Sequence, residues 1–347
     1  MVTLWFYIVA VLITIYVVLD GFDLGTGALH LFVARSDTER RTVLQSIGPV
    51  WDGNEVWLLA GGGALVLAFP KLYASAFSGF YLPLMMVLWL LILRAISIEF
   101  RSHLKSPVWR PLWDVVFSFS SLFLAVLLGA ALGNVVRGVP LGADGYFFTP
   151  LWTSFGVSGT EPGILDWYTV SVGVTSLVAL TYHGAMWLVL KTDGAIRDRA
   201  RRAAGTLWPL LLVLVGSVTI MTFRIQPHVP ERLNQNPLSY LFPLLALAGI
   251  GGSRWFTVRG RELQAFLGSA IFLVFMLVSV VFCLYPMVLP AVGDVANSLT
   301  IHNASGPQYS IAVALYWWVP GMILVGLYTY FMYRQMRGKV ELDPDGY

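Results

Sequence analysis

Four carboxylic acids stand in two pairs inside otherwise apolar stretches of this sequence. Asp20 and Asp23 are three residues apart, and so are Asp52 and Glu55. Residues three apart on an α-helix are neighbours on its surface, so each pair would present two carboxylates on one face. A carboxylate near the centre of a bilayer costs about 2.5–3.5 kcal/mol on insertion scales. We therefore expect these groups to bind protons, water or cationic partners.

The composition indicates that the apolar stretches cross a membrane. The 347 residues are 57% hydrophobic and 12% charged, whereas a soluble domain has about 25% charged residues. The formal net charge of +3 does not indicate a nucleic-acid partner, because membrane topology governs where the charges lie. The single cysteine, Cys283, excludes both an intrachain disulfide and a cluster of thiolate metal ligands.

Nine apolar segments are long enough to cross a bilayer as helices, which takes about 20 residues each. Open sheet edges are not tolerated in lipid, so strands are excluded. The nine segments are Leu4–Val33, Ile47–Phe69, Ala76–Phe100, Leu112–Val136, Ile164–Leu190, Thr206–Phe223, Leu238–Phe256, Leu263–Leu289 and Ile311–Tyr333. We predict an all-α, polytopic membrane protein of about nine transmembrane helices, arranged as two four-helix bundles plus one peripheral helix.

The whole chain, 1–347, is predicted to be a single integral membrane domain. Residues 1–137 would form the first helix bundle with the acidic cluster, 138–162 an extracytoplasmic loop, and 163–347 the remaining helices. Counting alternate connections places 17 of the 22 lysines and arginines on one side, 4 on the other, and Arg94 within a span. The positive-inside rule then predicts an external N-terminus and a cytoplasmic C-terminus.

This orientation places the four carboxylates in the cytoplasmic half of the membrane. Arg94, Glu99 and Asp114 are expected at the same depth, and Trp51 and Trp57 flank the second acidic pair. One buried arginine cannot neutralise several carboxylates, so we interpret the set as a proton path from the cytoplasm. The alternative is a structural polar network that fixes helix register. Glu99 and Asp114 lie near span ends, where interfacial salt bridges are also expected.

Histidine is the residue type to examine for a haem or metal site. Of the five histidines, only His183 lies well inside a predicted span, and the sequence has no C-x-x-C-H pattern. One intramembrane histidine cannot supply two axial haem ligands. We therefore predict no metal site and no cofactor bound by this chain, and interpret His183 as a hydrogen-bonded core residue.

Several motifs resemble one known family. They are Gly21-Phe22-Asp23-Leu24-Gly25, Asp37-Thr38-Glu39-Arg40-Arg41, the run Gly48-Pro49-Val50-Trp51-Asp52-Gly53-Asn54-Glu55-Val56-Trp57, Ala76-Phe77-Ser78-Gly79-Phe80-Tyr81, Glu99-Phe100-Arg101, Trp113-Asp114, Gly133-Asn134 with Gly138-Val139-Pro140, His183-Gly184-Ala185 and Asn303-Ala304-Ser305. In this order they resemble subunit II of the cytochrome bd quinol oxidases.

The resemblance implies a two-subunit oxidase core, often joined by a small single-helix subunit, in the bacterial cytoplasmic membrane. Such a complex oxidises membrane quinol and reduces O2 to water with protons from the cytoplasm. Haem b, haem d and the quinol-oxidising loop would lie in subunit I. Subunit II would be haem-free, brace that partner within the membrane lipid and contribute a proton entry. A structural quinone or a lipid is a further candidate ligand of this subunit.

The resemblance also implies roles for individual residues. Asp23, Trp51, Asp52, Arg94 and Glu99 match family positions linked to assembly or to the proton path. At the position of Glu55 the family also uses glutamine, and Trp57 matches a position near a lipid-side route for O2.

Two other classes of function fit the acidic spans. A proton-coupled secondary transporter also places carboxylates within the membrane, but it predicts discontinuous helices around a substrate cavity and function without a haem partner. A purely structural assembly subunit predicts that neutralising the acids affects stability only.

Overall fold

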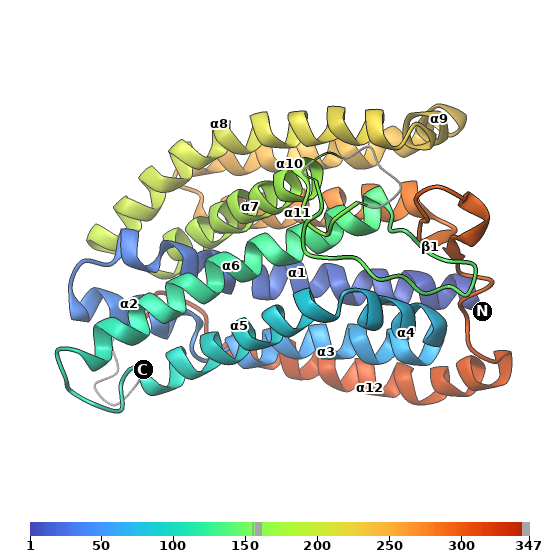
Figure 1. Ribbon diagram of the computed structural model, residues 1–347. Helices are drawn as coiled ribbons and strands as arrows, with labels where there is room; N and C mark the ends of the chain where they lie inside the picture. Colours follow the sequence, from blue (N-terminus) through green and yellow to red (C-terminus); the bar gives the residue numbers. More distant parts are fainter. Residues whose placement is uncertain (155, 157–161, 342–347) are drawn as a thin grey trace.

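The apolar segments form long helices that run side by side along one axis, as the computed structural model of the chain shows (Figure 1). The structure describes residues 1–154, 156 and 162–341. The predicted loop 138–162 therefore lies partly outside the described residues. The chain begins at one end of the bundle and its last helix runs to the other, which we call the N-terminal and the C-terminal end (Figure 1).

Helices make up nearly all of the regular structure. In chain order the α-helices are α1 (Val2–Val33), α2 (Asp37–Ile47), α3 (Trp51–Ala68), α4 (Pro70–Gly79), α5 (Tyr81–Phe100), α6 (Trp109–Arg137), α7 (Trp167–Lys191), α8 (Gly194–Ile225), α9 (His228–Gln235), α10 (Leu241–Val258), α11 (Glu262–Leu284) and α12 (Gln308–Gln335). Two short 3₁₀ helices are η1 (Pro237–Tyr240) and η2 (Val295–Asn297). The strands β1 (Met287–Leu289) and β2 (Leu299–Thr300) form a small antiparallel hairpin at the N-terminal end (Figure 1).

The helices form two groups of four and one outlying helix. Helices α1, α3, α5 and α6 make up the first group, and α7, α8, α10 and α11 the second; α1 and α6 both pack on α7 and join the groups. The last helix, α12, packs mainly on α3 and has only one fully buried residue, Ile311. The prediction of an all-α membrane protein with two four-helix bundles and a peripheral helix is confirmed.

Eight helices among the described residues are long and apolar enough to cross a membrane, and a bent pair makes a ninth candidate. In that pair α3 and α4 meet at an angle of 119°. The bend occurs at Phe69-Pro70, where the proline begins α4 and the residue before a proline is disfavoured in the helical conformation. The predicted second span is thus α3, and α4 is a short helix that sequence periodicity did not predict.

Helix α2 shows why the polar connection after α1 is also helical. Ser36 caps this helix, since its hydroxyl accepts from the Glu39 amide while the Glu39 carboxylate accepts from the Ser36 amide. This reciprocal capping box satisfies amides that the helix cannot pair internally. The connection between the predicted spans Ile164–Leu190 and Thr206–Phe223 is likewise mostly helical, because α8 already begins at Gly194.

Helices α1 and α7 cross with their backbones in direct contact at two glycines. A Cβ atom added to Gly184 would lie 2.7 Å from the Cα of Gly25, which is closer than non-bonded carbon atoms approach. Only glycine at both positions permits this crossing, and α1 is thereby held against the second group of helices.

We expect Gly184→Val to destabilise the protein by about 1–3 kcal/mol or more, because the added side chain forces α1 and α7 apart. Thermal unfolding of the purified protein would measure the loss. Gly216→Val is the matched control, since a Cβ at Gly216 meets nothing within 4 Å. Equal stability of the two variants would contradict the close crossing.

Candidate functional site

Arg94 of α5 is the centre of a buried cluster with carboxylates of α1 and α3. Its two terminal nitrogens donate to the two Asp20 oxygens at 2.9 and 2.7 Å. One of these nitrogens also donates to Glu55 Oε2 at 3.2 Å. The side chains of Arg94 and Asp20 are fully buried, whereas 20% of the Glu55 side chain is exposed. The bidentate pairing uses the fork geometry of the guanidinium, so this contact links three helices.

Asp23 lies one turn further along α1 and has a different set of partners. Its Oδ2 accepts from Asn54 Nδ2 at 2.7 Å. The Oδ1 of Asn54 in turn accepts from the Tyr333 hydroxyl of α12 at 2.8 Å. Asp23 and Asn54 are buried. A hydrogen-bonded chain therefore runs from α1 through α3 to α12.

The cluster holds more carboxylate than the protein neutralises. Asp20, Asp23 and Glu55 provide three carboxyl groups, and Arg94 is the only cation hydrogen-bonded to any of them within the described residues. Asp23 Oδ1 is buried without a hydrogen-bond partner among those residues. A buried charge without a partner is strongly unfavourable. The surplus carboxyl groups are therefore the places where this part of the chain can hold a proton or order water.

The structure does not bring Asp52 or Glu99 into this cluster. Asp52 is exposed in the first turn of α3, on the same helix face as Val56 and Leu59, which are 46% and 72% exposed. Glu99 is exposed in the last turn of α5, five residues after Arg94, so the two side chains point in different directions. Of the residues expected in a proton path or polar cluster, Asp20, Asp23, Glu55 and Arg94 therefore lie together, whereas Asp52 and Glu99 lie outside the buried group.

Both flanking tryptophans are buried. Trp51 is 9% exposed and packs in an apolar cluster with residues of α1, α2, α5 and α7, and Trp57 is 6% exposed in a second cluster toward the N-terminal end. Their large side chains fix the rotation of α3 and thereby the direction of the polar residues between them.

A second buried ionic cluster lies at the C-terminal end of the bundle. Asp114 of α6 accepts from His30 at 2.7 Å, from Arg101 at 2.6 and 3.2 Å and from Arg40 at 2.9 Å. The interpretation of Asp114 as a salt-bridge residue near a span end is confirmed.

Further ion pairs at this end link α2 to the second group of helices. Glu39 pairs with Arg199, and this contact lowers the pKa of the Glu39 carboxyl. The ionised pair therefore stabilises the fold above the unfolded-state pKa of glutamate, and the contribution is lost as the pH falls through the folded-state value. Because Glu39 is close to the surface, the effect is small.

The histidines do not form a haem or metal site among the described residues. His183 Nε2 donates to the Val18 carbonyl at 3.0 Å, and its Nδ1 lies 2.7 Å from the Ser269 hydroxyl. His30 Nε2 forms a hydrogen bond with Asp114 Oδ1 at 2.7 Å. No group of three or more His, Cys, Asp or Glu side chains in this part of the chain could hold a metal ion. Both ring nitrogens of His183 are thus engaged by protein groups, and the interpretation of His183 as a hydrogen-bonded core residue is confirmed.

Sequence reasoning missed two members of the polar cluster. Asn54 stands between Asp52 and Glu55, and its amide in an apolar helix was an available signal. Tyr333 is 279 residues away from Asn54 along the chain, and no local pattern relates the two positions.

Comparisons with known proteins agree with this architecture. Residues 1–336 match the family model described as cytochrome bd terminal oxidase subunit II. The probable cytochrome oxidase subunit 2 of Haemophilus influenzae is 31% identical over 98% of this chain and 95% of its own length. The cytochrome bd-I ubiquinol oxidase subunit 2 of Escherichia coli K12 is 30% identical with the same coverage.

A third relative and one solved structure extend these similarities. The cytochrome bd ubiquinol oxidase subunit 2 of Bacillus subtilis is 30% identical over 96% of this chain and 95% of its own. The solved structure is that of the bd oxidase from Geobacillus thermodenitrificans, with a TM-score of 0.76 at 18% identity, covering 97% of this chain and 98% of that one. This last similarity shows the fold.

The bundle and its buried ionic clusters define a multi-span helical membrane protein. The family match and the relatives identify it further. The chain belongs to the cytochrome bd terminal oxidase subunit II family, and is thus an oxidoreductase subunit of a respiratory chain.

Proposed function

We propose that this chain is the haem-free subunit II of a bd-type quinol oxidase in the bacterial cytoplasmic membrane. It braces a haem-carrying subunit I and contributes to proton uptake from the cytoplasm. The complex oxidises membrane quinol and reduces O2 to water, with haem b, haem d and the quinol site in subunit I. A small single-helix subunit is a further expected partner.

The observation that carries the proton role is the surplus of buried carboxyl groups. The guanidinium of Arg94 pairs with Asp20 and Glu55, whereas Asp23 has only an amide donor and keeps one oxygen without a partner among the described residues. A purely structural ion pair needs one acid for one base. Each further acid in a membrane interior costs stability, so its presence points to a function.

The arrangement of the acids supports entry from the surface of α3. Asp52 is exposed, Glu55 is partly exposed one turn later, and the Arg94–Asp20 pair is fully buried next to Glu55. This order leads from the outside of the chain to its interior. On the exposed face of α3, Asp52 is available to water or to the partner subunit.

The ion pairs at the C-terminal end support a cytoplasmic location for that end. Arginines of α2, α6 and α8, and Arg101 directly after α5, take part in them, and basic residues favour the cytoplasmic side. The proposal therefore puts the N-terminus outside and the C-terminus in the cytoplasm. The family membership also favours an oxidase subunit over a proton-coupled transporter.

Replacing Asp23 by asparagine in the purified oxidase tests the proton role. The amide keeps the size and can still hydrogen-bond, but it cannot exchange a proton. We expect turnover to fall by about tenfold or more, since positioned proton transfer typically contributes 10²- to 10⁴-fold. Oxygen uptake measures turnover, and the optical spectrum measures haem content.

Asp198→Asn is the control, because Asp198 is an exposed aspartate of α8. The proposal requires Asp23→Asn to lose turnover while haem content and assembly stay intact. Loss of assembly together with activity would instead favour the structural network. Unchanged turnover in an intact complex would remove Asp23 from the proton path.

A further inference from the structure

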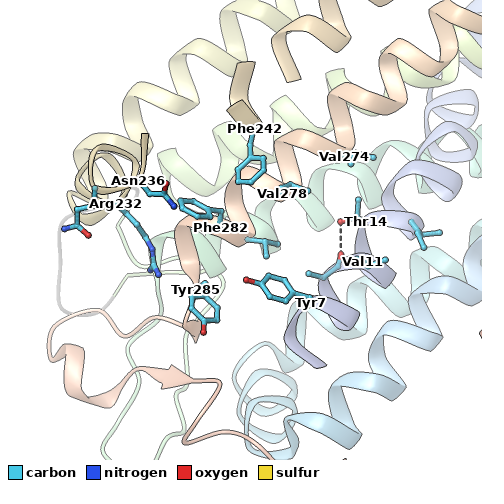
Figure 2. A pocket seen from close by; sticks show the side chains of 14 residues that line it. Tyr7, Val11, Thr14, Arg232, Asn236, Phe242, Val274, Val278, Phe282 and Tyr285 are labelled. Carbon is cyan, nitrogen blue, oxygen red and sulfur yellow. Dashed lines mark hydrogen bonds between the residues drawn. The ribbon is translucent and has the colours of Figure 1, made fainter. Parts of the chain in front are cut away.

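A cavity of about 670 Å³ opens between α1, α9, α10 and α11, apart from the carboxylate cluster. Figure 2 shows its lining side chains. Its volume falls in the range of about 300–1,000 Å³ that is typical of ligand pockets. The cavity lies toward the N-terminal end, where α1 begins and where α9 crosses the end of the bundle (Figure 1).

The charged and amide side chains of this cavity come from α9 and the residue that follows it. Arg232 and Asn236 lie at one end of the cavity in Figure 2, whereas Val274 and Val278 line the wall away from it. The one hydroxyl deeper along α1, that of Thr14, donates to the carbonyl of Ala10 in its own helix at 2.7 Å. The deep wall therefore offers a ligand almost only apolar contacts.

Arg232 carries a charge that the described residues leave uncompensated. No carboxylate among them lies within ion-pair distance of its guanidinium, which is 5.7 Å from the centre of the Tyr285 ring. Val229 and Leu233 of the same short helix are buried. Helix α9 is thus amphipathic and suited to lie at the membrane surface, with Arg232 at the level of the lipid headgroups.

We propose that this cavity binds an anionic glycerophospholipid, with its phosphate at Arg232 and one acyl chain along the wall formed by α1 and α11. A guanidinium without a carboxylate partner in the described part of the chain matches a phosphate in charge and hydrogen-bonding geometry, and the apolar wall matches a hydrocarbon chain. The entrance lies among Tyr7 and Val11, which are 50% and 55% exposed on a membrane-spanning helix. A ligand can therefore enter sideways from the bilayer.

A neutral ring compound with two carbonyl groups fits the cavity less well. Its head would gain less from the charge of Arg232 than a phosphate does, and the Thr14 hydroxyl already donates within its own helix. The lipid would fill a space between the two helix groups that α1 and α11 border, and this structural role goes beyond the proposed oxidase function.

Native mass spectrometry of the purified complex tests the site, with phosphatidylglycerol added to delipidated samples as the probe and phosphatidylcholine as the zwitterionic comparison. We expect retained phosphatidylglycerol to fall by about tenfold in Arg232→Gln, because the charged hydrogen bonds between the guanidinium and the phosphate would be lost. Arg224→Gln is the matched control, an exposed arginine in the last turn of α8 outside the cavity.

A second pair of variants tests the apolar wall without changing charge. Val278→Trp should fill the cavity and reduce binding of phosphatidylglycerol, whereas Leu267→Trp, at an exposed position of α11 outside the cavity, should not. Any of four results would overturn the proposal. The first three are equal binding of phosphatidylglycerol to Arg232→Gln and the unaltered chain, equal loss of it from both arginine variants, and binding no better than that of phosphatidylcholine. The fourth result is a co-purified quinone mass that disappears in Val278→Trp.

Discussion

Replacing Arg94 by methionine should destabilise the protein by about 3–5 kcal/mol, because removing one partner of a buried ion pair leaves the other charge uncompensated. The bidentate partner, Asp20, is fully buried, and Glu55 would lose its cation as well. We expect a low yield of assembled complex and a lower thermal unfolding temperature, measured on the purified protein.

A second substitution keeps this result interpretable if the variant fails to fold. Asp20→Asn combined with Arg94→Met removes both charges, so the double variant should recover part of the lost stability. Arg224→Met is the control for loss of an exposed arginine. If the double variant were no more stable than Arg94→Met alone, the uncompensated charge of Asp20 would not be the cause of the lost stability.

The second large effect is expected at Asp114. Asp114→Asn would leave Arg101, a buried cation, with only the half-exposed Asp37 as a carboxylate partner, and would weaken the contacts to His30 and Arg40. A loss of about 3–5 kcal/mol is again expected from the broken buried network. Thermal unfolding and the yield of purified protein are the measurements.

Asp37→Asn provides the comparison within the same network. Asp37 also pairs with Arg101, but 47% of its side chain is exposed, so its loss should cost no more than about 1 kcal/mol. If the two aspartates gave equal effects, burial would not be the reason for the importance of Asp114.

The helices could be predicted from the sequence because each span is a long apolar run. The predicted second span ends at Phe69, and the structure begins the next helix, α4, at Pro70. The two boundaries agree because proline interrupts a helix at the preceding residue. Helix α4 itself, with its mixed composition, was not predicted. Its position depends on packing against neighbouring helices, which a single sequence does not contain.

The carboxylate cluster could be predicted only in part, because spacing along a helix defines a face but not its direction. Asp52 and Glu55 are neighbours on α3, yet the boundary between exposed and buried surface falls between them. The rotation of α3 decides this, and it is set by Trp51 and Trp57 among others. The pairing of Arg94 with Asp20 likewise depends on which helices are adjacent.

Helix α12 lies at the edge of the bundle with little buried surface. Its Tyr333 hydroxyl donates a hydrogen bond to the amide oxygen of Asn54. Proteins are synthesised from the N-terminus, so Asp23 is made long before Tyr333. The hydrogen-bonded chain that begins at Asp23 is therefore completed only after α12 has been translated, and until then the Asn54 amide oxygen lacks its Tyr333 donor.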